Sequence, residues 1–599
     1  MLSLSSNMID HSPVNVVFIR ICAVLLQYAP LIETIVVAGL VAYSLFAPGP
    51  LNNAVKIAIL VSASFLILEL SYALLVYRKH KVRLMREANY PEPLTSAERA
   101  ALFERCLENV LDRERYLQLW FLGAPISDIK RENVREFLLW AFFDKDGYES
   151  RARLAASDDI DQAHGESEQE VEQYVDRIEE FLGRNIPPGR GPATSLRLSI
   201  DAIHARYRSV VWYSIVGLVD LQTHVYLSMH GFRYYSPSLH VTMSVFPPRL
   251  QALPNLWTKK GLQSASSEIG YWLRPHTSKT RMPVVFLHGI GIGLWPYARI
   301  IAEISGPEDA DDGQIGVLAL EILPMSMRLT SPPLPKEEFL AHLTAILRQH
   351  APEWNEFLIL SHSYGSVLTT HMLRSPSLGP RIKGVMLIDP VSILLHLPDI
   401  AYNFTRRKPR TANEWQLWYF ASMDLGVAEG LGRHFFWTEN IIWREELATL
   451  HTKFDGCIDA PFRDDDNDDD NNNNNDDTRV DSAVQNRTKQ AMGSGKRHVA
   501  VFLSGKDIIL DSRAVAQYLA ARGTLGDSQD EDLRDIRELL TERKTDTRVT
   551  CRSYVSASGI EISWFPLLDH SQLFERRETR NRVLDTIRRY TLKEPELEN

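Results

Sequence analysis

The apolar pattern begins with two long runs near the N-terminus. The first covers Val16–Phe46 and is cleanest over Ala29–Ala47, and the second covers Ala54–Tyr77. Each is close to the ~20 apolar residues that cross a bilayer as a helix. The turn Pro48-Gly49-Pro50 separates them. The pattern therefore predicts an N-terminal membrane region, residues 1–86, with two spans at about 29–47 and 54–77 that form a hairpin.

A basic cluster directly after the second run predicts the orientation of the chain. Lys and Arg gather on the cytosolic side of membrane spans, so everything downstream is expected in the cytosol. The endoplasmic reticulum and lipid droplets would both suit such an anchor. A hairpin that enters one leaflet only, or a signal peptide, is the alternative. The cluster consists of Arg78, Lys79, Lys81, Arg83 and Arg86.

Residues 87–234 have the periodicity of helices. Thr95-Ser96-Ala97-Glu98 has the form of a capping box. The stretch 155–169 is acidic and poor in large apolar residues, which predicts a linker. Val210–Met229 is apolar and is expected to be a core helix, with an interfacial helix as the alternative.

From residue 235 onward, short apolar runs alternate with helical patterns, as in a parallel sheet covered by helices. A long aromatic-rich insertion, about 390–497, interrupts the alternation and contains an Asp/Asn run at 464–477 that cannot bury a core. We expect a cap there, with the acidic run as a disordered loop. The predicted strands are Val284–Leu287, Ile315–Leu320, Phe357–Leu360, Val385–Ile388, Val499–Leu503 and Glu561–Phe565.

Charge and cysteine content exclude several classes of function. The net charge is −10, and without the eight aspartates of the run 464–477 it is −2, so no basic surface for nucleic acid is expected. The four cysteines are scattered, without the spacing of a metal site or a disulfide framework. We predict no metal and no cofactor.

The strongest chemical signal is Ser363. It lies in Ser361-His362-Ser363-Tyr364-Gly365, directly after the predicted strand Phe357–Leu360. A small-x-Ser-x-Gly sequence between strand and helix is a nucleophile elbow, a strained turn that raises the serine hydroxyl above a sheet. Ser361 stands where glycine is usual, and it is still small.

A serine nucleophile needs a histidine base that a carboxylate orients. His570, in a loop before a C-terminal helical pattern, is the expected base. Asp507 follows the predicted strand Val499–Leu503 and is the expected acid, with Asp511 and Asp389 as alternatives.

Acyl transfer also needs donors for a developing oxyanion. We expect one from the backbone N–H of Tyr364, after the nucleophile. The other is expected from the glycine-rich loop His288-Gly289-Ile290-Gly291, at Ile290 or, failing that, Gly291.

These motifs, over about residues 236–592, resemble the α/β-hydrolase superfamily, in its serine esterase and lipase-like branch. The resemblance implies an α/β fold with a mostly parallel eight-stranded sheet, a helical cap inserted after the sixth strand, and hydrolysis of an ester or amide. The chain is also similar to membrane-anchored fungal α/β-hydrolases, a likeness that implies no substrate.

The sequence thus predicts a membrane-anchored carboxylic ester hydrolase that acts on a hydrophobic, lipid-like ester, with a role in lipid metabolism. The aromatic residues of the cap suit an acyl chain, or they form ordinary core. A triad-based acyltransferase and a non-catalytic scaffold on the same fold are the alternatives. Oligomeric state is left open.

Overall fold

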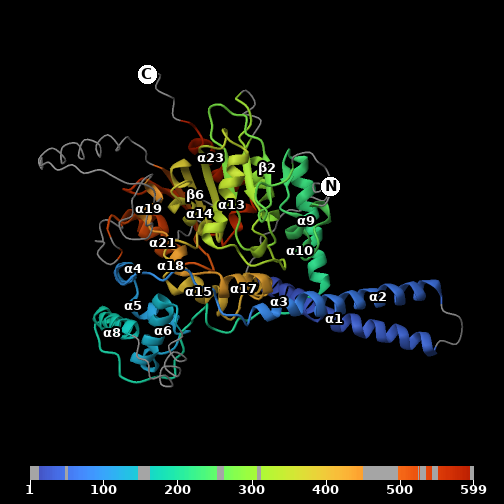
Figure 1. Cartoon of the computed structure of the whole chain (residues 1–599), viewed down its shortest axis with the longest axis horizontal. Helices are drawn as coiled ribbons and strands as arrows, with labels where there is room; N and C mark the ends of the chain where they lie inside the picture. The colour runs from blue at the N-terminus through green and yellow to red at the C-terminus, as the bar shows by residue number, and fades with distance from the viewer. Residues whose placement is uncertain are drawn as a thin grey trace, which may run out of the picture.

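The computed structural model describes nine parts of the chain: residues 12–46, 52–145, 162–252, 262–305, 312–449, 497–523, 525, 534–541 and 551–593. A sheet with helices on both faces forms the centre of the molecule, and a helical bundle and a two-helix hairpin extend from it (Figure 1). The predicted disordered run 464–477 lies outside the described residues.

The central sheet has nine described strands in the order β1-β2-β4-β3-β5-β6-β7-β9-β8. The six strands from β4 to β9 in this order run parallel, while β2 and β8 are antiparallel to their neighbours. The strands are β1 Arg233–Tyr235, β2 Tyr271–Arg274, β3 Val284–Leu287, β4 Val317–Leu320, β5 Phe357–His362, β6 Ile382–Ile388, β7 His498–Ser504, β8 Arg552–Val555 and β9 Ile560–Phe565.

All six predicted strands are present, and the sheet has one strand more than the eight expected. The sequence pattern missed β1, β2 and β8. Strand β2 is buried at all four positions, but one of them is Arg274, which breaks the apolar run. Strand β8 is short, polar and lies at the sheet edge, paired with β9 only.

Two helical layers cover the sheet because its strands are apolar on both faces. Val285 and Leu287 of β3 face one core, and Val284 and Phe286 face the other. The first core is shared with α13 Lys336–Gln349, α14 Gly365–Arg374, α21 Ser512–Ala520 and α22 Arg534–Leu540. The second is shared with α12 Ala298–Glu303 and α23 Arg577–Tyr590.

The described part of the insertion between β6 and β7 forms a helical cap. Its elements are α15 Pro398–Thr405, α16 Ala412–Gln416, a π-helical turn Leu417–Ser422, α17 Leu425–Arg433, α18 Trp437–Asn440 and α19 Arg444–Ala448. Residues 450–496 of the predicted cap lie outside the described residues. With its strand order, helical layers and cap position, the chain has the α/β-hydrolase fold.

The bundle that precedes the sheet has its own core around Phe137, Leu138 and Val175. The capping box at Thr95 and Glu98 is present. The predicted linker 155–169 is wrong in its second half, because residues 162–169 form the first part of helix α8. The bundle helices are α4 Ser96–Glu108, α5 Arg113–Trp120, α6 Arg131–Phe143 and α8 Gln162–Leu182.

The N-terminal hairpin consists of α1 Pro13–Phe46 and α2 Asn53–Tyr72, and α2 continues through a π-turn, Ala73–Tyr77, into α3 Arg78–Arg83. By length and composition both arms are apolar enough to cross a membrane, and only 11% of the most apolar stretch of each is buried. The base of the hairpin is fixed to the cap, since Arg83 makes a bidentate ion pair with Glu429 of α17 at 2.5 and 2.7 Å.

Strand register brings the predicted chemistry to one edge of the sheet. Ser361 pairs with Leu387, Ile388 with Phe502, and Ser504 with Phe565. The carboxyl ends of β5, β6, β7 and β9 are therefore level. The loops that follow carry Ser363, Asp389, Asp507 and His570.

Candidate active site

Ser363 occupies a sharp turn between β5 and α14. Its φ is +50°, in the left-handed region that residues other than glycine seldom adopt. The backbone N–H of Ser363 donates to the carbonyl of Ile388 at 3.0 Å, which ties the turn to the end of β6. The surrounding sheet therefore holds a strained conformation that aims the hydroxyl away from the strands.

Small residues flank Ser363 because strand and helix nearly touch. A Cβ on Gly365 would lie 2.3 Å from the carbonyl oxygen of Leu287. Ser361 replaces the usual glycine at no cost in hydrogen bonding, since its buried hydroxyl accepts from Thr369 Oγ1 at 2.9 Å. The departure from the elbow pattern thus leaves the turn intact.

Three of the predicted residues form a continuous chain of hydrogen bonds. Ser363 Oγ lies 2.9 Å from His570 Nε2, and His570 Nδ1 lies 2.7 Å from Asp507 Oδ2. The other oxygen of Asp507 accepts from the backbone N–H groups of Ile509 and Leu510. These contacts orient the carboxylate as an acceptor for the N–H at His570 Nδ1. The other ring nitrogen, Nε2, is then free to accept a proton.

The two alternative acids have other partners. Asp511 caps α21, where its carboxylate accepts from Ala514 N at 3.0 Å. Asp389 accepts from the backbone and hydroxyl of Ser504 and from the backbone N–H of Ser571. Asp389 therefore braces the ends of two strands and the loop that carries His570.

Asp569 also fixes this loop, and the sequence pattern did not single it out. One carboxylate oxygen accepts from the backbone N–H groups of Ile508 and His570, and the other accepts from Asn413 Nδ2 in the cap. It joins the acid loop, the base loop and the cap. The only feature of the sequence that could have pointed to Asp569 is its position directly before His570, the predicted base.

The glycine-rich loop lies against Ser363. A Cβ on Gly289 would come 2.9 Å from the Cβ of Ser363, so no larger residue fits. The N–H of Gly291, the fallback donor, is engaged by the carbonyl of Met325 at 3.1 Å. Among the described residues, the N–H groups of Ile290 and Tyr364 have no acceptor, so both are available to an oxyanion.

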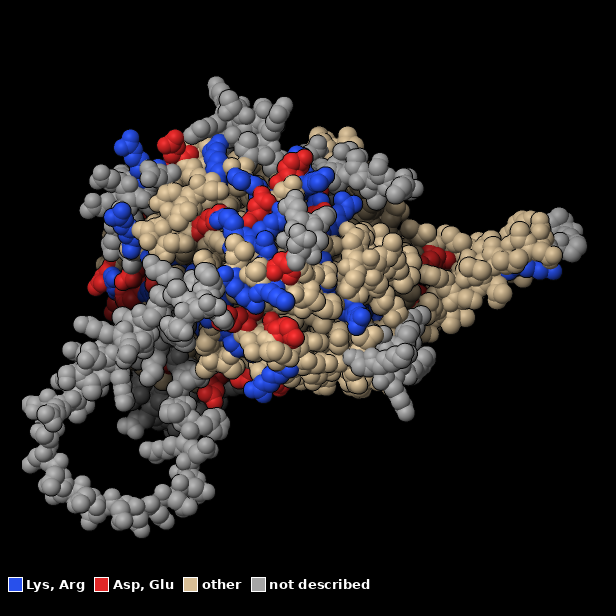
Figure 2. All heavy atoms as spheres, turned by 90° about the horizontal axis from the view of Figure 1, so that it is seen from above, with Lys and Arg blue, Asp and Glu red and all other residues tan. Residues whose placement is uncertain are grey.

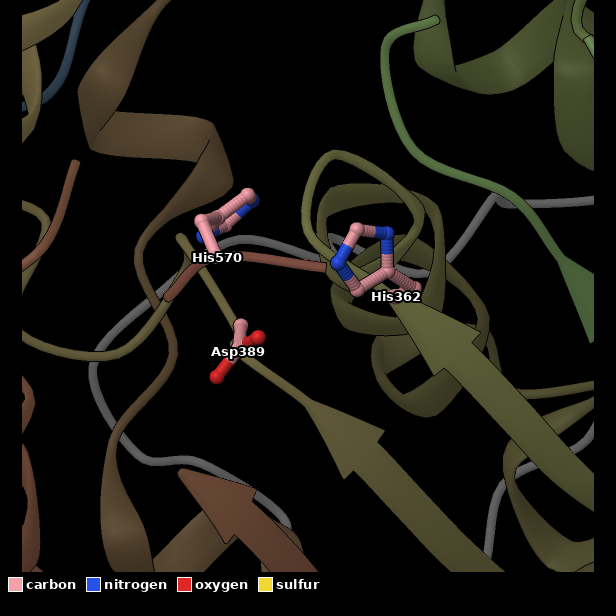
Figure 3. Close-up of side chains that lie close together, drawn as sticks. All are labelled: His362, Asp389 and His570. Atoms are coloured by element: carbon pink, nitrogen blue, oxygen red, sulfur yellow. The ribbon is translucent and has the colours of Figure 1, made fainter. Parts of the chain in front are cut away.

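His362, Asp389 and His570 each place one potential ligand atom within 4.8 Å of the others (Figure 3). A metal ion bound by these residues would have to displace hydrogen bonds that Asp389 and His570 already make. Both nitrogens of His570 are engaged by Ser363 and Asp507, and Asp389 already accepts from three donors. Burial, with the charges of nearby histidines, holds the pKa of His362 well below its ordinary value.

Burial favours the neutral imidazole of His570 and lowers its pKa, but the neighbouring carboxylates have the larger, opposite effect. The charge and hydrogen bond of Asp507, together with the charges of Asp389 and Asp569, raise the pKa of His570 to about 9. Burial, and then repulsion from Asp507, raises the pKa of Asp389 to about 7. Three carboxylates, and not Asp507 alone, therefore favour the protonated form of His570.

The pKa of His570 predicts a pH profile. Because only the neutral imidazole accepts a proton, the rate of Ser363 acylation should rise with pH and level off above about 9. Asp389→Asn removes a negative charge that favours imidazolium, so the rise should move to lower pH. The rate of fluorophosphonate labelling measured against pH checks this. A profile that does not move in Asp389→Asn would contradict it, and Asp511→Asn is the matched control.

An apolar cavity opens onto Ser363. Its walls come from three parts of the chain. Ile290 and Tyr364 belong to the site, Phe404, Leu431, Phe435 and Trp437 to the cap, and Trp120 and Trp140 to the bundle.

The aromatic residues of the cap are thus divided between two roles. Phe435 and Trp437 line the cavity. Tyr419 and Trp443 are buried in packing, with 0% and 3% of their surface exposed. Because Trp120 and Trp140 line the cavity, the bundle contributes to its walls.

Comparison with known proteins gives structural likenesses only. No model of a known protein family and no curated protein matches the chain. A carboxylesterase from Bacillus subtilis is 12% identical over 62% of this chain and 98% of its own, with a TM-score of 0.27. A bacterial membrane phospholipase A described as a virulence factor is 11% identical over 63% and 94%, with a TM-score of 0.28. Naproxen esterase from Bacillus subtilis is 12% identical over 62% and 98%, with a TM-score of 0.29. Because these TM-scores are low, the fold is assigned from the strand order, and the function is proposed from the geometry of the site.

Proposed function

We propose that the chain is a membrane-anchored serine hydrolase that cleaves carboxylic esters with lipid-like acyl groups. The observation that carries this is the hydrogen-bonded series Ser363, His570, Asp507 at the mouth of an apolar cavity. The elbow strain at Ser363 and the free N–H groups of Ile290 and Tyr364 support it.

The reaction proceeds in two halves. Ser363 Oγ attacks the ester carbonyl as His570 Nε2 accepts its proton, and Asp507 stabilises the imidazolium. The N–H groups of Ile290 and Tyr364 bind the oxyanion, a contribution of about 3 kcal/mol for each donor. His570 then protonates the departing alcohol. A water molecule, deprotonated by His570, releases the acid and restores Ser363.

Labelling with a fluorophosphonate, followed by assay of esters in the presence of alcohol or lysolipid acceptors, tests the proposal. A hydrolase releases free acid as the main product. Transfer to the acceptor as the main product would favour an acyltransferase. Wild-type protein that does not label would favour a non-catalytic scaffold.

The apolar cavity predicts a preference for long acyl chains. Each methylene that enters it should contribute about 0.8 kcal/mol, or roughly fourfold in kcat/KM. Leu431→Trp partly fills the cavity and should lower kcat/KM for long-chain p-nitrophenyl esters far more than for the acetate. Leu111→Trp, at a leucine 50% exposed and outside the cavity, is the control. Equal losses for both chain lengths would contradict an acyl pocket.

The anchor and its orientation remain part of the proposal. The apolar hairpin supports membrane attachment. The basic cluster after it supports a cytosolic hydrolase domain on the endoplasmic reticulum or a lipid droplet.

A further inference from the structure

Helix α9, Val210–Met229, is apolar on two faces: one face, with Trp212, Tyr213 and Val216, is buried in the body, and the other is exposed. Five large apolar residues spaced three or four apart form one exposed stripe along it. Helix α9 contains only one Asp, Glu, Lys or Arg, Asp220. The stripe consists of Ile215, Leu218, Leu221, Val225 and Met229, whose exposed fractions range from 38% to 79%.

The charged residue of α9 points inward. Asp220 accepts from Arg249 Nε at 2.9 Å and lies 2.8 Å from Arg328 Nη2, and these three side chains are each at least nine-tenths buried. A helix on the surface of a soluble protein buries one apolar face and carries polar and charged residues on the other. Because the exposed face of α9 is also apolar and its one charged residue is buried, the helix has the pattern expected where an outer face meets lipid.

The stripe is continuous with the hairpin. Helix α9 contacts both α1 and α2. Glu69 of α2 accepts from the backbone N–H of Val210, at the start of α9, at 2.8 Å, and from Tyr207 Oη at 2.5 Å. In Figure 1, α9 runs along the edge of the body from which the hairpin projects, crosswise to its two arms. Figure 2 shows mostly uncharged surface where the body meets the hairpin.

The length of the free hairpin places the stripe at the membrane. Because Glu69 is bound to the body, the part of α2 that can enter lipid is Asn53–Leu68, about 24 Å long. The hydrocarbon core of a bilayer is about 30 Å thick. The free part of α2 is shorter than this thickness, so it can be buried in lipid along its whole length only if the body lies directly against the bilayer.

We propose that the apolar stripe of α9 is a lipid-facing surface that seats the body on the bilayer, with α9 lying in the interface. The occupant of this face is the acyl region of the membrane that holds the hairpin. The proposal rests on membrane attachment of the hairpin and is independent of the esterase activity.

Fluorescence quenching of the full chain in vesicles of phosphatidylcholine and phosphatidylserine tests the proposal. An environment-sensitive dye is attached at Leu218→Cys or Val225→Cys, with the native cysteines replaced by alanine. Val555→Cys, at a valine 63% exposed on β8, is the matched control, and Leu60→Cys in α2 reports insertion of the hairpin. Ile215→Cys and Leu221→Cys repeat the measurement in case one variant folds poorly.

We expect lipid-borne nitroxide to remove most of the fluorescence at Leu218, Val225 and Leu60, and little at Val555. Quenching at Leu218 by aqueous iodide as strong as at Val555 would place the stripe in water and overturn the proposal. A dye shielded from both quenchers would mean that protein covers the face, which also overturns it. Loss of lipid quenching at Leu60 would remove the anchor on which the proposal rests.

Discussion

Ser363→Ala should abolish fluorophosphonate labelling and lower ester hydrolysis by a factor on the order of 10⁵ to 10⁶. The change removes the nucleophilic oxygen, which lies 2.9 Å from His570 Nε2. It leaves the elbow intact, because the backbone N–H of residue 363 still donates to Ile388. Mass spectrometry of the labelled peptide, with initial rates on a long-chain ester, measures the effect.

The control for this result is Ser267→Ala, at an exposed serine that does not line the cavity at Ser363. It should label and hydrolyse like the wild type. The melting temperature of Ser363→Ala should match that of the control. Labelling of Ser363→Ala at the wild-type level would mean that another residue is the nucleophile, and the proposed site would be wrong.

Asp507→Asn should lower kcat by roughly 10⁴ with little change in stability. An amide at this position cannot hold His570 in the tautomer that leaves Nε2 free to accept a proton. The 2.7 Å contact to Nδ1 and the two backbone donors on the other oxygen support the proposed role of Asp507 as the acid that orients His570. Initial rates at saturating ester, measured across the pH range of the wild type, check it.

Two matched substitutions separate Asp507 from the other candidates. Asp511→Asn should retain nearly wild-type activity, because asparagine caps a helix as well as aspartate does. Asp389→Asn should change the pH profile, as argued above, and reduce the rate far less than Asp507→Asn. If Asp389→Asn lost as much activity as Asp507→Asn, Asp389 would be the catalytic acid.

Two charged residues that interrupt the apolar runs, Arg20 and Glu69, have structural partners in the body. Glu69 receives hydrogen bonds from Val210 and Tyr207, and Arg20 lies over the ring of Trp415 in the cap, 5.2 Å from its centroid. The ends of both hairpin helices nearest the body are therefore bound to protein. From sequence they look like interruptions of a membrane span, because the pattern cannot show which part of a long helix packs against the rest of the protein.

Much of the fold was predictable because it rests on local pattern. Buried parallel strands read as short apolar runs, and all six predicted ones are present. Ser363 was identifiable since the elbow requires small residues at fixed offsets. Strands β1, β2 and β8 were missed because sheet edges and buried arginines break the apolar pattern.

The order of the candidate catalytic residues along the chain, and the strands that they follow, could be predicted from local pattern. The pattern favoured Asp507 as the acid but left Asp511 and Asp389 open, because all three follow a strand and any could cap a turn. The fold shows that Asp507 is the carboxylate that contacts His570, which depends on how the loops after β6, β7 and β9 converge. The bundle's part in the cavity and the outward stripe of α9 were likewise settled by packing between distant segments, which no local pattern encodes.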